Sequence, residues 1–180
     1  YDKAKYEDYV TNCLGIKSTA AQHERAEKLL SQLPMLSLPL EYSYDFIMDM
    51  GGTVTPDKAL MPLLKTYVDA ETDLSNCHVA QLPAVDGYRL LLICGNNAVG
   101  EGRFFLCSID KQGKLTENLL IYTAQTILWK GKEENSFLHF KVNKGGQITL
   151  NKTIVHNKKE VVISKKNIQF RRGIFYSISD

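Results

Sequence analysis

Two glycines separated by four residues, Gly95 and Gly100 in the segment GNNAVGEGR, have a spacing that could serve phosphate chemistry. A phosphate-binding loop needs this gap followed by a lysine, which neutralises phosphate, and by a hydroxyl residue, which holds magnesium. Here Glu101 stands at the lysine position, and its carboxylate would repel phosphate. The apolar segment RFFLCSI follows, so no helix N-terminus is available for a pyrophosphate. The segment therefore predicts the turn of a β-hairpin.

The four cysteines form no metal-binding pattern. Cys13, Cys77, Cys94 and Cys107 include no C-x-x-C pair, and the adjacent Cys77 and His78 cannot build a tetrahedral site by themselves. Cys94 and Cys107 flank the expected hairpin, so a cross-strand disulfide stays open beside the alternative of free, buried thiols. The sequence fixes no disulfide state, and we expect no metal and no cofactor.

The histidines are the remaining candidates for catalysis. His23, His78, His139 and His156 are scattered, with no G-x-S-x-G elbow and no H-E-x-x-H motif in the chain. Catalytic residues can assemble from distant positions, which keeps a small hydrolase with dispersed catalytic residues as one alternative. His139 lies on an alternating strand and is expected to be at the surface or partly buried. No catalytic residue is therefore assigned.

Two acidic clusters, in YSYDFIMDMGG and VDAETD, could in principle hold a cation. VDAETD lacks the glycine and the terminal glutamate of a calcium loop, and no flanking pair of helices fits it. We expect both clusters to be solvated, and no metal site is assigned.

Basic residues gather in the C-terminal part of the chain. Residues 140–180 contain nine Lys and Arg against two Asp and Glu, whereas residues 1–80 contain seven against twelve. Phe170-Arg171-Arg172 and Phe175-Tyr176 combine cations with aromatic rings, as surfaces that bind a polyanion do. No RNA-binding signature accompanies them, so nucleic acid is not an expected partner. A solvated, lysine-rich set of strand ends is the simpler interpretation.

The first part of the chain has helical patterns. One helix is expected over residues 2–14, with Gly15 as its stop, and a second in STAAQHERAEKLLSQL. The segment LPMLSLPLEYSYDF reads as an extended, apolar connection. A short helix should follow, with Thr55 as N-cap, Pro56 as first residue and a kink or 3₁₀ turn near Pro62.

From about Val79 onward, short apolar segments alternate with turns, which predicts about eight strands. Leu138, Phe140 and Val142 should share one face of SFLHFKV. The connections are too short for the crossovers that parallel strands need. The fold class is therefore α+β: N-terminal helices packed on a mostly antiparallel sheet that can curl into a barrel or sandwich. The strand segments are YRLLLIC, RFFLCSI, LTENLLIY, QTILW, SFLHFKV, QITLNKTIV, VVIS, IQFRR and IFYSI.

The length of 180 residues fits a single domain. We divide it into a helical lead-in (1–35), a proline-containing connection with a short helix (36–77) and an antiparallel β region (78–180). No apolar run approaches the roughly 18–20 residues that a membrane-spanning helix needs. No transmembrane segment is therefore expected.

The phrases LP…LPL, LCSIDKQGKLTENLLIY and FLHFKVNKGGQITL carry one resemblance, over residues 36–180. This pattern resembles the β-rich ectodomains of uncharacterised lipoproteins from Bacteroides and related gut bacteria. The resemblance implies export to the periplasm or cell surface and a lipid anchor on a cysteine upstream of Tyr1. It supplies no catalytic or ligand-binding residue to carry over.

The expected function is therefore a non-catalytic, envelope-associated binding or structural module, with envelope proteins or glycans as candidate partners. The first alternative is an interaction protein that binds a polyanion through the basic C-terminal strands. The chain starts at Tyr1 rather than at a methionine, which is what a removed leader or a trimmed chain would give.

Overall fold

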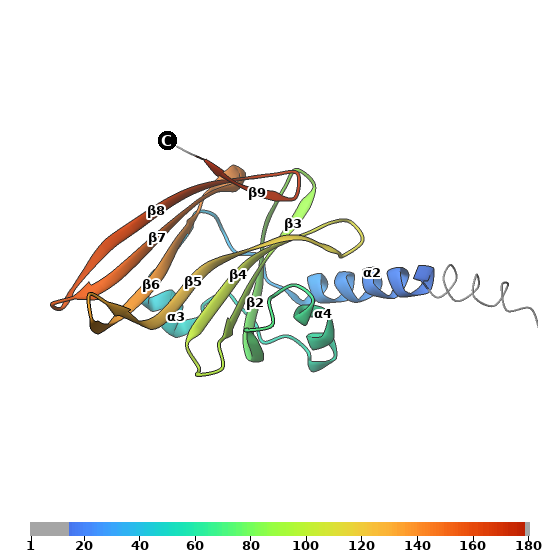
Figure 1. Cartoon of the computed structure of the whole chain (residues 1–180). Helices are drawn as coiled ribbons and strands as arrows, with labels where there is room; N and C mark the ends of the chain where they lie inside the picture. Colours follow the sequence, from blue (N-terminus) through green and yellow to red (C-terminus); the bar gives the residue numbers. More distant parts are fainter. Residues whose placement is uncertain (1–14, 179–180) are drawn as a thin grey trace, which may run out of the picture.

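The structure, a computed structural model, describes residues 15–178, in which nine strands form one antiparallel sheet. The helix expected over residues 2–14 lies outside the described residues. Strands β2 to β9 are neighbours in chain order, and the short β1 pairs with β6 (Figure 1). The elements are α2 (Gly15–Gln32), β1 (Leu40–Glu41), α3 (Tyr44–Asp49), η2 (Lys58–Leu60), α4 (Met61–Lys65), β2 (Asp73–Val85), β3 (Tyr88–Asn96), β4 (Gly102–Ile109), β5 (Leu115–Trp129), β6 (Lys132–Val142), η3 (Lys144–Gly146), β7 (Gln147–His156), β8 (Lys159–Arg171) and β9 (Ile174–Ile178).

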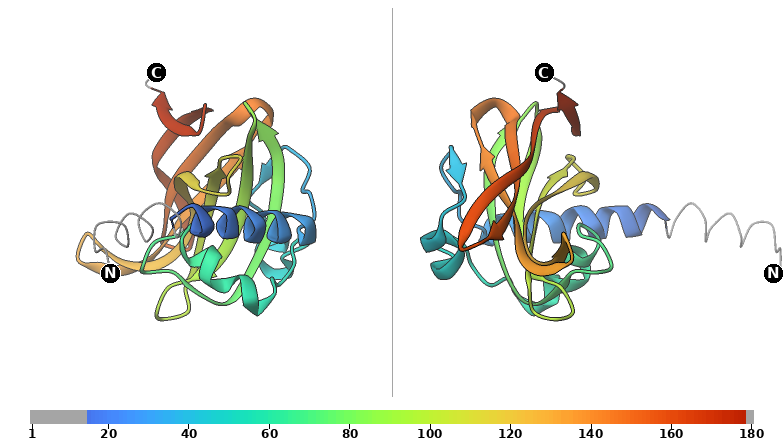
Figure 2. Two further views of the ribbon diagram at one scale, coloured as in Figure 1. Left: turned by 90° about the vertical axis from the view of Figure 1, so that its right-hand side faces the viewer. Right: turned by 60° about the vertical axis from the view of Figure 1, so that its left-hand side comes forward.

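The sheet curves strongly but does not close. β2 and β9 are its end strands, and they are not paired with each other. The curvature brings the β8–β9 turn back onto the start of β5, where Thr116 Oγ1 donates a hydrogen bond to the carbonyl oxygen of Gly173 at 2.8 Å. Figure 2 shows this bent sheet from two further sides. The expected α+β class is confirmed, whereas the curl stops short of a barrel.

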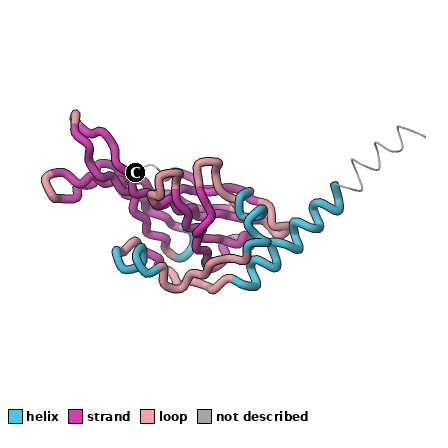
Figure 3. The backbone as a smooth tube through the Cα atoms, turned by 90° about the horizontal axis from the view of Figure 1, so that it is seen from below, coloured by secondary structure: helices cyan, strands magenta, loops and turns pink. Residues whose placement is uncertain are grey.

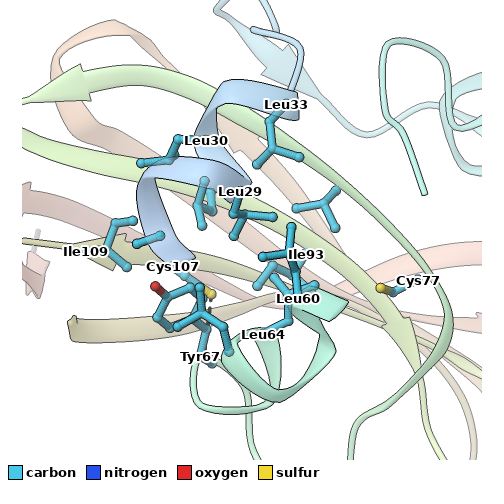
Figure 4. Close-up of a cluster of buried hydrophobic side chains, with 14 of the residues drawn as sticks. Leu29, Leu30, Leu33, Leu60, Leu64, Tyr67, Cys77, Ile93, Cys107 and Ile109 are labelled. Carbon is cyan, nitrogen blue, oxygen red and sulfur yellow. Dashed lines mark hydrogen bonds between the residues drawn. The ribbon is translucent and has the colours of Figure 1, made fainter. Parts of the chain in front are cut away.

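Helices α2 and α4 cover one face of strands β2 to β4 and form what we call the helix-side cluster (Figure 4). Leu29 of α2, Leu64 of α4 and Tyr67 have no exposed surface. They pack against Ile93 and Cys107 of the sheet. Burying leucine side chains in this way stabilises the fold by about 1.5–3 kcal/mol each, so α2 is an integral part of the domain.

The β4–β5 turn is fixed to this helical layer through Gly113. The Tyr67 hydroxyl donates to the Gly113 carbonyl oxygen at 2.6 Å, and Gln22 Nε2 donates to the same oxygen at 3.4 Å. Burial raises the pKa of the Tyr67 hydroxyl far above its ordinary value, which keeps this donor protonated. Gly113 has φ +83°, as expected for the glycine of this turn.

The other face of the sheet encloses what we call the inner cluster. The connection after α2 and helix α3 pack against it. Figure 3 shows this connection running from the end of α2 to α3 at the opposite end of the molecule. Helix α3 begins at Ser43, whose Oγ accepts a hydrogen bond from the Phe46 N–H at 3.0 Å. The cluster contains Leu82, Leu90, Leu92, Cys94, Phe104, Leu106, Ile121, Tyr122, Phe140, Val142, Ile148, Leu150, Ile168 and Phe170.

Several expected boundaries were wrong. LTENLLIY and QTILW form one strand, β5, and VVIS and IQFRR form one strand, β8. Thr55 and Pro56 precede the short helix, whose 3₁₀ part begins at Lys58 and whose α-helical part contains Pro62 in its first turn. Gly15, expected to stop a helix, is helical.

No described helix is both long enough and apolar enough to cross a membrane.

Candidate ligand-binding groove on strands β6 to β8

Strands β6 to β9 present an outer face opposite the inner cluster. In β6, Phe140 and Val142 point into the inner cluster, as expected from their alternation, so His139 and Lys141 point outward. Directly opposed residues on neighbouring strands share a face. His139 is opposed by Asn151, and Asn151 is opposed by Lys165, which makes one row across three strands. The sheet register thus gathers an imidazole, an amide and an ammonium group.

A hollow of about 480 Å³ lies over this row, and we call it the groove. Its volume falls within the range of small-molecule sites, roughly 300–1,000 Å³. Strands β6, β7 and β8 supply most of the lining, and the segment after β1 supplies Tyr42. The lining residues are Glu41, Tyr42, His139, Phe140, Lys141, Asn143, Thr149, Asn151 and Lys165.

The Tyr42 ring lies in the groove between two other rings, which hold it in place from both sides. Its ring centroid lies 3.8 Å from that of His139 and 5.9 Å from that of Tyr122, which stacks on it. Its backbone N–H donates to the Phe140 carbonyl oxygen at 2.9 Å. Burial and the nearby charge of Glu160 raise the pKa of the Tyr42 hydroxyl, which therefore stays a neutral donor.

His139 is held in turn by a carboxylate. Its Nε2 contacts Glu160 Oε1, and the same oxygen accepts a hydrogen bond from Thr153 Oγ1 at 2.5 Å. Burial alone would raise the pKa of Glu160, but the hydrogen bonds from Thr153 and His139 outweigh it and leave that pKa below its usual value. An ionised Glu160 accepts a hydrogen bond from His139 Nε2–H, so His139 is oriented for a fixed contact with Tyr42.

The second ring nitrogen of His139 is buried and has no hydrogen-bond partner among residues 15–178. A buried polar nitrogen without a partner costs about 1–3 kcal/mol. His139 acts as a support for the Tyr42 ring.

The polar groups of the groove are available to a ligand. Within residues 15–178, the side chains of Lys141, Asn151 and Lys165 make no hydrogen bond or ion pair, and Lys141 and Lys165 are exposed. The Tyr42 hydroxyl bordered by an amide and two ammonium groups can bind a polar, hydroxylated ligand that carries negative charge. These residues are drawn from three strands whose register is not readable in the sequence.

The segment GNNAVGEGR forms the β3–β4 turn, as expected. Asn97 Oδ1 accepts hydrogen bonds from the backbone N–H groups of Val99 and Glu101, at 3.1 and 2.9 Å. The Glu101 carboxylate accepts from Asn97 Nδ2 at 2.9 Å and from the Thr126 N–H at 3.2 Å. The loop's polar groups are used internally, so it offers no cradle for phosphate.

The cysteines of the described chain are free, buried thiols. Cys94 opposes Phe104 and belongs to the inner cluster, whereas Cys107 opposes Leu91 and belongs to the helix-side cluster. The sheet separates the two sulfurs, which excludes the disulfide that remained open. Burial raises the pKa of both thiols, which makes them poor nucleophiles. Cys13 lies outside the described residues.

The other histidines do not join the groove. His78 Nδ1 lies 3.3 Å from Thr53 Oγ1 beside a hollow of about 230 Å³, which Cys94 and Tyr122 also line. His156 Nδ1 lies 3.2 Å from Glu134 Oε1. His23 lies on α2.

The acidic clusters have structural roles where the structure describes their contacts. Asp69 accepts hydrogen bonds from Arg103 and from Thr72 Oγ1, and the bond from Arg103 is the main reason that its pKa is lowered. Asp45 and Asp49 are exposed on α3. Among the described residues, no three His, Cys, Asp or Glu side chains come together as a metal site would require.

The basic segment near the C-terminus is divided by the sheet. Phe170 is fully buried, whereas Arg171 and Arg172 are exposed and line a second hollow of about 700 Å³ with Tyr176, which is 53% exposed. Trp129, at the end of β5, is half-buried under Lys130, whose Nζ lies 5.7 Å from the ring centroid. Of the aromatic residues in the basic segment, Tyr176 alone exposes most of its side chain.

No family model, no curated protein and no solved structure matches this chain.

Proposed function

We propose that this protein is a non-catalytic, envelope-associated binding module that holds a glycan in the groove. The observation that carries the proposal is the supported Tyr42 ring beside the unpaired groups of Lys141, Asn151 and Lys165. Sugars offer hydroxyl groups for the Asn151 amide and for the Tyr42 hydroxyl, which is a neutral donor. The chain Thr153–Glu160–His139–Tyr42 fixes the ring in advance, which lowers the entropy cost of binding.

Binding fits this groove better than hydrolysis. A hydrolase needs an activated nucleophile, or a carboxylic acid that is protonated at working pH. Glu160 is held ionised, Thr153 donates its hydroxyl hydrogen bond to Glu160, and no serine or cysteine of residues 15–178 lines the groove. His139 and Glu160, the candidates for acid–base catalysis, are hydrogen-bonded to each other and position the Tyr42 ring.

The assignment to the envelope is a separate part of the proposal. It is supported by the resemblance of residues 36–180 to lipoprotein ectodomains. Sequencing of the encoded precursor tests it directly. A basic stretch, an apolar run and a cysteine upstream of Tyr1 are expected. A start methionine directly before Tyr1 would refute the assignment to the envelope but not the proposal that the groove binds a glycan.

Replacing Asn151 with alanine should weaken glycan binding about five- to tenfold, because one amide's hydrogen bonds are worth about 1 kcal/mol. Isothermal titration with the best ligand from a glycan array measures the change. Lys152→Ala is the matched control, since Lys152 is exposed on the same strand but lies outside the groove lining. Equal affinity in the Asn151 and control variants, or an array without any bound glycan, would refute the groove as the site.

A further inference from the structure

The groove is one end of a longer basic strip on the outer face. Lys165, Asn167, Gln169 and Arg171 alternate along β8 without a bulge, so their side chains share the face of the groove. Tyr176 of β9 opposes Gln169, and Ile174 opposes Arg171, so the same face continues onto the last strand. The second hollow of about 700 Å³ lies at that end.

The length of the strip follows from strand geometry. Lys165 and Arg171 are six residues apart on one strand, and a strand rises about 3.3 Å per residue, which gives about 20 Å. Lys141 belongs to the next row across the three strands. It lies opposite Thr149, and Thr149 lies opposite Asn167, which is two residues from Lys165 on β8. Cations therefore occupy both ends, and amide and hydroxyl side chains lie between them.

Within the part of the chain that the structure describes, the cations of this strip have no ion-pair partner. Among residues 15–178, Lys141, Lys165, Arg171 and Arg172 form no ion pair. Asp86, in the turn between β2 and β3, approaches the β8–β9 turn, and its Oδ2 accepts a hydrogen bond from the backbone N–H of Arg172. Glu160 is held by His139 and Thr153 at the groove end, and Glu41 is the one further acid in the groove lining.

We propose that the strip binds a linear acidic polysaccharide, with one sugar on Tyr42 in the groove and a more distant carboxylate or sulfate at Arg171 and Arg172. This inference rests on the proposed function and names its ligand class. Anionic groups spaced along an extended chain match two cationic ends about 20 Å apart. The amide group of Asn151 suits the hydroxyl groups of sugars, whereas Gln169 Nε2 already donates to the carbonyl oxygens of Gly145 and Phe170, and Asn167 Oδ1 accepts from Thr149 Oγ1.

A nucleic acid fits the same strip less well. Single strands are held by several exposed aromatic rings on which successive bases stack. Phe170 is fully buried and Phe175 packs against the inner cluster, which leaves Tyr176 as the ring near the two arginines. One stacking position at this end favours a polymer whose recognition depends on charge and hydroxyl groups.

The test compares a galacturonate octamer with the dimer by isothermal titration at 50 and 200 mM NaCl. The octamer is expected to bind at least about tenfold more tightly at low salt and to lose about tenfold at high salt, because two or three ion contacts release counterions. Arg171→Ala with Arg172→Ala should weaken octamer binding about tenfold and leave the dimer unchanged. Lys158→Ala with Lys159→Ala removes the same charge at the β7–β8 turn and should change neither.

One outcome would overturn the extended strip but not the groove. In it, the dimer and the octamer bind with equal affinity, the arginine substitutions do not change the affinity, and Asn151→Ala still weakens binding. Arginine-dependent binding of a thymidylate 12-mer without binding of the octamer would overturn the polysaccharide class. Tight binding of a neutral glucose octamer, insensitive to salt, would also overturn it. A protein that binds none of these sugars contradicts the proposed function itself.

Discussion

Phe140→Ala should lower the free energy of unfolding by about 3–5 kcal/mol, the cost of removing a large buried aromatic side chain. Phe140 is 2% exposed, and its ring centroid lies 6.3 Å from that of Phe46 on α3. It also lines the groove, and its carbonyl oxygen accepts the Tyr42 N–H. Thermal and urea unfolding measure the loss, which corresponds to a fall in Tm of roughly 6–20 °C for a domain of this size.

Leu128→Ala is the matched control for that substitution, because Leu128 is 74% exposed at the end of β5. Its effect should stay within about 0.5 kcal/mol. A similar loss in both variants would mean that the inner cluster does not support the groove as the structure describes it.

Gly113→Ala should cost about 2–4 kcal/mol, from two physical sources. A side chain at φ +83° is strained by about 1–2 kcal/mol, and the added methyl group would overlap the Cβ of Ala26 on α2. The turn or the helix must then move, which would disturb the hydrogen bond between Tyr67 and the Gly113 carbonyl. Urea unfolding measures the loss.

Gly131→Ala separates the two sources. Gly131 has φ +80°, but nothing lies within 4 Å of a Cβ added there. It should therefore show the strain alone, about 1–2 kcal/mol. Identical losses at both glycines would argue against close packing of the β4–β5 turn on α2.

The sequence pattern predicted the class of the fold because antiparallel hairpins leave local signals. The turn at Gly113, the alternation of Leu138, Phe140 and Val142 and the end of α2 before Pro34 were all found where expected. Each depends on neighbouring residues only.

The errors arose where polar residues were taken for strand ends. The segment Thr123-Ala124-Gln125 in β5 contains no glycine or proline, and the strand continues through it after a bulge near Ile121. In β8, Ser164-Lys165-Lys166 likewise follows a bulge and belongs to an open edge, where polar side chains face solvent. Helix α3 was missed although Ser43 carried a capping signal.

The groove could not be predicted because it depends on register. His139, Asn151 and Lys165 become neighbours only when two turns set the pairing of three strands. A change of one residue in either turn would place Lys165 beside a different partner and on the opposite face. Tyr42 comes from a distant part of the chain, through the pairing of β1 with β6.

Chemical-shift mapping of the ¹⁵N-labelled protein with the galacturonate octamer tests the central claim most directly, because it locates the ligand without any substitution. The account predicts that the largest shifts fall on the backbone amides of Tyr42, His139, Asn151 and Lys165, with a second group at Arg171 and Arg172. Largest shifts in the β3–β4 turn or around His78 would contradict it. The absence of any shift with about 10 mM octamer would mean that binding is weaker than millimolar, and would contradict it as well.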